Sequence, residues 1–91
     1  MTYDVQYHAL VANVDIPALP REWRDKIRQA IEERLMIHPE IYGKPLRRSL
    51  KGYRKLRVGD WRVIFRIERT IVKIFVIQHR SSVYKTGEKR L

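Results

Sequence analysis

The sequence has no cysteine, which excludes disulfide bonds, thiolate zinc sites and thiol nucleophiles. Its histidines, His8, His38 and His79, are scattered without the spacing of metal ligands, so we expect neither a metal nor another cofactor. No apolar run approaches the length of about eighteen residues that spans a membrane, and the first residues lack the pattern of a secretory signal. We therefore expect a cytoplasmic protein with no membrane partner.

Acidic residues are also scarce. The chain has 20 Lys and Arg residues against 10 Asp and Glu, which gives a formal charge of +10 over 91 residues and a pI near 10.4. Such an excess favours a polyanionic partner, which is a nucleic acid, an anionic membrane surface or an acidic protein, and the membrane is the weakest of the three. The length suits one domain, residues 1–91, with a single modest core.

Hydrophobic periodicity organises the first half of the chain. Alternating residues predict a short strand at Tyr3–Tyr7, and the ambiguous segment 10–19 predicts a short helix that ends in a turn near Ala18–Pro20. The clearest helix begins after Pro20, has apolar residues at three- and four-residue spacing, and should end near Ile37. Segment 38–51 contains two prolines and a glycine and is expected to be a loop.

Three strands are predicted in the second half, at Tyr53–Val58, Trp61–Glu68 and Ile71–Gln78. Gly59-Asp60 and Arg69-Thr70 connect them, although only the first pair has favoured turn chemistry. The last strand is apolar at nearly every position, so we expect it to lie inside the sheet. The tail 85–91 is polar and should form a frayed turn or a short helix.

The predicted hairpin sorts its side chains onto two faces. Because strand residues alternate, a core that contains Trp61, Val63, Phe65 and Ile67 also takes Leu56 and Val58. The same alternation turns four cations, Lys55, Arg57, Arg62 and Arg66, toward one outer face. Fixed cations at strand spacing suit the phosphate backbone of a nucleic acid.

These features resemble a known family. The order β-α-α-β-β-β, the hairpin Gly52-Tyr-Arg-Lys-Leu-Arg-Val-Gly-Asp-Trp-Arg-Val-Ile-Phe and the ending His79-Arg-Ser-Ser-Val-Tyr84 resemble the RelE/ParE superfamily of toxins from type II toxin–antitoxin modules. Within it they resemble the RelE-like ribosome-dependent mRNA endonucleases. The resemblance implies an α+β, RelE-like fold: a small, mainly antiparallel twisted sheet of about four strands packed on two N-terminal helices, with a basic cleft on its other face.

The resemblance also implies a chemistry and its residues. The ribose 2′-hydroxyl attacks the adjacent phosphate without a metal, which requires a base, stabilisation of the phosphorane and protonation of the leaving oxygen. Lys55 matches a family lysine and is the candidate base or transition-state stabiliser. Arg62 would hold the scissile phosphate, Arg80 would stabilise the phosphorane or serve the leaving group, and Tyr84 would stack on a base. Seven further residues are expected to position RNA or the ribosome: Arg47, Arg48, Lys51, Arg54, Arg57, Arg66 and His79.

Two positions depart from the best-studied RelE pattern. Tyr53 stands where that pattern has a second lysine, and Gln78 stands where it has an arginine. A catalytic arginine is therefore either missing or replaced in its role by Arg80 or His79. The resemblance leaves two alternatives to the endonuclease: a ParE-like inhibitor of DNA gyrase on the same fold, and a catalytically inactive RNA-binding relative. The implied partners are mRNA, the ribosome and a cognate antitoxin with an acidic neutralising segment.

Overall fold

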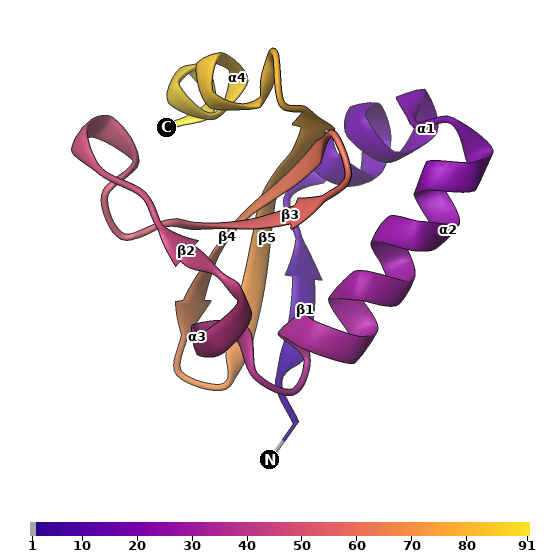
Figure 1. The fold of residues 1–91 in the computed structure, drawn as a ribbon. Coiled ribbons are helices and arrows are strands. Elements are labelled where there is room, and N and C mark those ends of the chain that lie inside the picture. The colour runs from indigo at the N-terminus through magenta and orange to yellow at the C-terminus, as the bar shows by residue number, and fades with distance from the viewer. Residues whose placement is uncertain (1) are drawn as a thin grey trace.

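Five strands form one mixed sheet in the computed structural model, which describes residues 2–91 (Figure 1). The strands are β1 (Asp4–Tyr7), β2 (Lys44–Pro45), β3 (Arg54–Val58), β4 (Trp61–Glu68) and β5 (Ile71–His79). Their order across the sheet is β1-β5-β4-β3-β2, in which β1 runs parallel to β5 and the other neighbours are antiparallel. The prediction that the last strand lies inside the sheet is confirmed.

Helices cover both faces of this sheet. The α-helices are α1 (Ile16–Ala18), α2 (Arg21–Ala30), α3 (Pro39–Tyr42) and α4 (Val83–Arg90). Two π-helical turns, Val11–Asp15 and Ile31–Leu35, lead into α1 and extend α2, and a 3₁₀ turn spans Arg48–Leu50. The predicted helix after Pro20 is therefore present. Of the two forms expected for the tail 85–91, a frayed turn or a short helix, the structure has a helix, which begins at Val83. Within residues 2–91, the structure contains no helix long and apolar enough to cross a membrane.

The prediction of a loop at segment 38–51 is wrong in part, since this segment holds α3, β2 and the 3₁₀ turn. Strand β2 raises the strand number from about four to five. It pairs only two residues with β3, Lys44 with Lys55 and Pro45 with Arg54, which is too short to show a periodicity in the sequence. Pro45 is tolerated because β2 is an edge strand.

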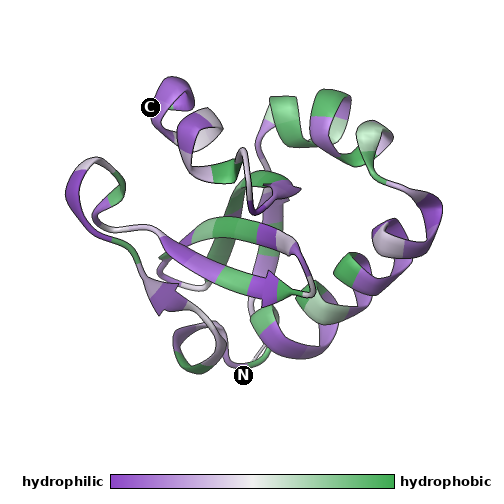
Figure 2. Ribbon diagram, turned by 45° about the horizontal axis from the view of Figure 1, so that its top comes forward, coloured by the Kyte–Doolittle hydropathy of each residue, from purple (hydrophilic) through white to green (hydrophobic). Residues whose placement is uncertain are grey.

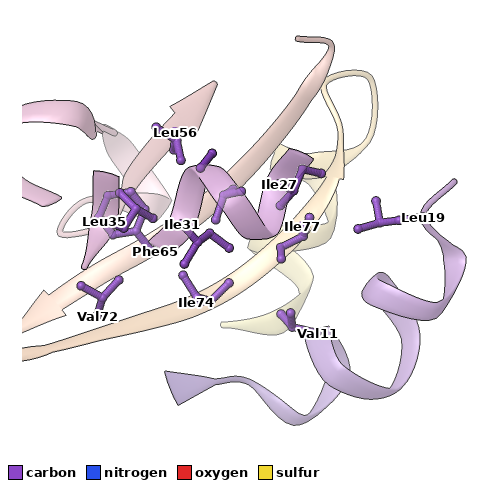
Figure 3. Close-up of a cluster of buried hydrophobic side chains, with 12 residues drawn as sticks. Val11, Leu19, Ile27, Ile31, Leu35, Leu56, Phe65, Val72, Ile74 and Ile77 are labelled. Atoms are coloured by element: carbon purple, nitrogen blue, oxygen red, sulfur yellow. The ribbon is translucent and has the colours of Figure 1, made fainter. Parts of the chain in front are cut away.

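The main core lies between the sheet and helices α1 and α2. Ile27, Ile31 and Leu35 of α2 and its extension meet Val63 and Phe65 of β4, all of them buried (Figure 3). Strands β4 and β3 thus present to the helices the face that the alternation predicts. Burial of these side chains fixes the register of the hairpin, because a slip by one residue would turn them to the opposite face.

A second, smaller core lies on the opposite face of the sheet. Ile64 and Val76 are fully buried there beneath Val83 of α4 and Leu50 of the 3₁₀ turn. The alternation that points cations to this face also points Ile64 to it, and helix α4 covers this apolar position. The predicted outer face is therefore only partly open, because α4 and the 3₁₀ turn cover the part around Ile64 and Val76.

Candidate functional site

The register of the hairpin places the predicted cations on one face. Lys55 pairs with Ile64, and Arg57 pairs with Arg62, so that all four point to the side of the sheet that carries α4. Arg66 follows on the same face of β4. After its first residue, β3 alternates hydrophilic and hydrophobic residues from Lys55 to Val58, as Figure 2 shows. The expected sharing of one face is therefore confirmed for Lys55, Arg62 and Arg66. Arg57 shares their register, but it also lines a pocket beside α2 with Lys26 and Glu33.

Lys55 and Tyr84 meet although 28 intervening residues separate them in the sequence. The Lys55 ammonium lies over the ring of Tyr84, with Nζ 5.6 Å from the ring centroid. Both residues are half-buried. Tyr84 lies in the first turn of α4, so the packing of this helix on Ile64 and Val76 brings the ring to the lysine. A cation held against an aromatic face has a restricted position, which favours precise contact with a phosphate.

Arg62 and Arg80 lie at the turn that joins β3 to β4. Nη1 of Arg62 donates to the carbonyl oxygens of Gly59 (2.8 Å) and Trp61 (2.9 Å), which holds the guanidinium at the turn. The backbone N–H of Arg80 donates to the carbonyl of Asp60 at 2.8 Å, and Nε lies 3.5 Å from the Asp60 carboxylate. This ion pair is exposed and weak, so a phosphate can compete for the Arg80 side chain.

Two residues predicted to position RNA face the other side of the sheet, although His79 directly precedes Arg80. Arg54 is on the face that carries α1 and α2, near the edge of the sheet. Its Nη1 donates to the carbonyls of Gly43 (3.0 Å) and Glu40 (3.4 Å). His79 pairs with Trp61 across the strands and contacts its ring edge-on, with ring centroids 5.6 Å apart. These contacts secure a loop and the end of a strand.

The remaining predicted cations lie in two places. Arg47, Arg48 and Lys51 are exposed in the loop that contains the 3₁₀ turn, and Arg48 has a left-handed backbone (φ 58°) that is uncommon outside glycine. Arg66 lies toward the other end of the sheet and donates to the Glu68 carboxylate at 3.1 Å. A hydrogen bond from Lys73 and the charges of nearby cations lower the pKa of Glu68.

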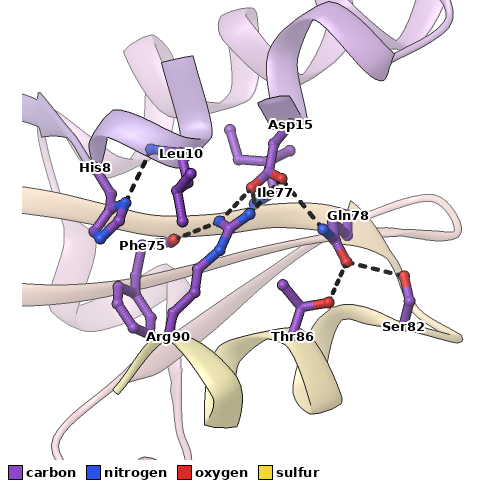
Figure 4. A network of polar contacts seen from close by, with 9 residues as sticks. All are labelled: His8, Leu10, Asp15, Phe75, Ile77, Gln78, Ser82, Thr86 and Arg90. Atoms are coloured by element: carbon purple, nitrogen blue, oxygen red, sulfur yellow. Dashed lines mark hydrogen bonds and ion pairs between the residues drawn. The ribbon is translucent and has the colours of Figure 1, made fainter. Parts of the chain in front are cut away.

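A polar network that the sequence analysis missed fastens α4 to the rest of the molecule (Figure 4). Arg90 donates to both oxygens of Asp15, at 2.7 and 2.8 Å, and to the carbonyl of Phe75 at 3.1 Å. The Asp15 side chain is 0% exposed and also accepts from the backbone N–H of Ile77 at 2.9 Å. The pairing of β1 with β5 ends at Ile74. Beyond it, side chains bind the β5 backbone in place of a strand: Asp15 accepts from the N–H of Ile77, and Arg90 donates to the carbonyl of Phe75.

Gln78 belongs to this network. Its amide nitrogen donates to Asp15 at 3.2 Å, and its amide oxygen accepts from Ser82 at 3.1 Å and from Thr86 at 2.8 Å. Gln78 is the cross-strand partner of Arg62, so the network lies directly beside the candidate site. The residue at the place of a family arginine thus holds the helix that carries Tyr84. One signal in the sequence could have indicated a buried ion pair. Asp15 follows Val11 by four residues, which places its carboxylate on the apolar side of segment 10–19.

Comparisons with known proteins agree on one class. Residues 7–84 match the family model described as ParE toxin of the type II toxin–antitoxin system parDE. The chain is 32% identical to toxin RelE of Mycobacterium tuberculosis, over 99% of this chain and 98% of that protein, and 33% identical to toxin RelG of the same organism, over 93% and 99%.

Solved structures show the same similarity. The crystal structure of the RelBE2 toxin–antitoxin complex from M. tuberculosis matches with a TM-score of 0.81 and 30% identity, over 88% of this chain and 100% of that chain. A mutant of E. coli toxin RelE in the free state matches with a TM-score of 0.76, over 100% of this chain and 99% of the other. Its identity of 17% shows a shared fold and no more.

Proposed function

This chain belongs to the RelE/ParE superfamily and is a toxin of a type II toxin–antitoxin module, and from that premise we propose that it is a ribosome-dependent mRNA endonuclease. The proposed reaction needs no metal. The ribose 2′-oxygen bonds to the adjacent phosphorus while the bond from phosphorus to the 5′-oxygen breaks. A base takes the 2′ proton and an acid protonates the 5′-oxygen, which leaves a cyclic phosphate and a 5′-hydroxyl.

The observation that carries this proposal is the contact between Lys55 and Tyr84, on the same sheet face as Arg62. The ammonium can stabilise the phosphorane or, once deprotonated, accept the 2′ proton, while the exposed part of the tyrosine ring offers a surface for a base. Nη1 of Arg62 is occupied at the turn, and the guanidinium has three further N–H donors for the phosphate oxygens. We assign to Arg80, at the same turn, the stabilisation of the phosphorane or a role at the leaving group.

The test is cleavage of a translated message in a reconstituted translation system. Arg62→Ala and Arg80→Ala are expected to lower the cleavage rate by about 100-fold or more, because each removes a charge that stabilises the transition state. Arg21→Ala is the matched control, since it removes an equal charge from the exposed start of α2 on the opposite face. Thermal unfolding of each variant separates loss of chemistry from loss of fold. Unchanged cutting by both variants would exclude these arginines from the mechanism.

A second candidate function is inhibition of DNA gyrase without chemistry, which is favoured by the match to the ParE description. The two functions differ in where growth arrest begins. Supercoiling by purified gyrase that stops on addition of the protein, with translation untouched, would support the second function. Binding of RNA with a steep salt dependence and no cleavage of translated message would support an inactive relative.

The proposed protein partner is a cognate antitoxin, as in the RelBE2 complex. A neutralising segment rich in acidic residues would match the charge of +10 and could cover the cations around Lys55 and Arg62. The expected result is that equimolar antitoxin stops cleavage and that the complex dissociates more readily as the salt concentration rises.

A further inference from the structure

A pocket lies on the same sheet face as Lys55 and Tyr84, toward the end where β4 turns into β5. It has a volume of about 240 Å³, smaller than the roughly 300–1,000 Å³ of pockets that hold drug-sized molecules. It therefore has room for one ring system. The side chains that define it come from four parts of the chain: Gln6, His8, Tyr53, Arg66, Lys73 and Phe75.

The sheet register explains why these residues meet. Gln6 pairs with Lys73, and Lys73 pairs with Arg66, so the three form one row across β1, β5 and β4. Tyr53 extends this row. Arg54 pairs with Phe65, so in these antiparallel strands Tyr53 lies opposite Arg66. Tyr53 is two residues from Lys55 on the same side of the chain, which is roughly 7 Å along a strand. A nucleotide next to one held at Lys55 can therefore reach the pocket.

An aromatic group forms the wall of the pocket. The rings of Tyr53 and Phe75 lie 4.8 Å apart at 31°, and His8 meets Phe75 edge-on at 5.5 Å. Phe75 is the extra residue of a β-bulge, because Ile64 pairs with Val76 and the next residue of β4 pairs with Ile74. A bulge of this kind redirects a side chain, and here it brings Phe75 beside Tyr53.

The polar groups of the pocket suit the edge and the phosphate of a nucleotide. Nδ1 of His8 accepts a hydrogen bond from the backbone N–H of Leu10 at 3.0 Å, which leaves Nε2 as the ring donor. The Arg66 guanidinium lies 5.8 Å from the Tyr53 ring centroid, and both Arg66 and Lys73 bind Glu68, at 3.1 and 2.9 Å. Because Glu68 cancels one of two positive charges, charge alone gives little affinity here and the aromatic wall must contribute.

We infer that this pocket binds one unstacked base of a single-stranded RNA, with Arg66 and Lys73 on the flanking phosphate. The inference rests on the proposed function for its choice of RNA. Bases stacked on aromatic side chains beside an arginine plane are the usual mode of single-strand recognition. An acidic peptide is the less favoured occupant. It would bind through Arg66 and Lys73, which already pair with Glu68, and it would make no use of the aromatic rings.

The test uses a short 2′-O-methyl oligoribonucleotide, which cannot be cleaved, and measures its affinity by fluorescence anisotropy and its contacts by NMR. Tyr53→Ala should weaken binding by about tenfold and Tyr53→Phe should leave it unchanged, because stacking needs only the ring. Lys73→Gln should weaken binding and Glu68→Gln should tighten it, each by about two- to fivefold. Glu22→Gln is the control, since it also removes a carboxylate paired with a lysine but lies on α2 across the sheet.

Two outcomes with the oligomer, and a third with an acidic peptide, would overturn the inference. One is equal affinity for an abasic oligomer, which would mean that only phosphates are bound. The other is a titration in which the oligomer shifts the NMR signals of Lys55 and Tyr84 but does not shift those of His8 and Lys73. An acidic peptide that displaces the oligomer from His8 and binds more tightly would identify a protein ligand instead. Because the oligomer is not cleaved, these results are independent of the cleavage assay, so failure of the pocket and failure of the endonuclease can be told apart.

Discussion

Replacing Arg90 by methionine should destabilise the protein far more than the loss of a surface charge. The Asp15 carboxylate is 0% exposed, and Arg90 supplies two of its four hydrogen bonds. Without the guanidinium, Asp15 keeps only the N–H of Ile77 and the amide of Gln78, and its charge stays buried. Removal of one partner from a buried ion pair costs about 3–5 kcal/mol, a large part of the roughly 5–15 kcal/mol that stabilises a small domain.

The assay is urea unfolding followed by far-ultraviolet circular dichroism. With a urea dependence of about 1–3 kcal/mol per molar, the loss should lower the midpoint by at least about 1 M. Lys26→Met is the matched control. It breaks the pair between Lys26 and Glu22 on the surface of α2, where both side chains are at least half exposed, and should cost less than about 1 kcal/mol.

The same variant should also affect the candidate site. Arg90 lies in the last turn of α4 and Tyr84 in the first, so a loosened helix would separate Tyr84 from Lys55. Cleavage by Arg90→Met should fall even at temperatures where the sheet stays folded. A midpoint that moves no further than that of the Lys26 control would refute the argument that this ion pair holds α4.

Three further predictions concern packing and pH. Gly43→Ala should cost about 1–3 kcal/mol, measured by urea unfolding, because its Cβ would overlap the buried ring of Phe65. Ile64→Ala should cost about 2–5 kcal/mol by the same assay, since it leaves a cavity beneath α4. Burial raises the pKa of Tyr7 above its ordinary value of 10.0, so the folded state favours the neutral hydroxyl. The contribution of Tyr7 to the free energy of unfolding is fully present below pH 10.0 and is lost as the pH rises through the folded pKa. In Tyr7→Phe the alkaline fall in stability should be shallower, as unfolding curves from neutral pH to above pH 10 will show.

The sequence could predict the hairpin and its faces because they depend on local alternation. Strand residues of period two, with a Gly-Asp turn between them, leave one register in which Val63 and Phe65 reach the core. The bounds of β4 were therefore predictable to the residue.

Features that depend on distant partners could not be predicted in this way. Strand β2 contains two residues, and the bulge at Phe75 appears only when β5 is aligned with β4. The ion pair between Asp15 and Arg90 joins positions 75 residues apart, and the spacing of Asp15 from Val11 indicates a buried carboxylate without indicating that Arg90 is its partner. The role of Gln78 likewise follows only from the packing of α4, which the sequence indicated as no more than a short helix or a frayed turn.

The most direct test of the central claim is primer extension on a message that ribosomes are translating. We predict new 5′ ends within ribosome-occupied codons for the wild type and for Arg21→Ala, and their loss in variants of Lys55, Arg62, Arg80 and Tyr84 that still fold. Intact message under the same conditions, together with arrest of gyrase supercoiling, would contradict the claim that these four residues form a site for RNA cleavage.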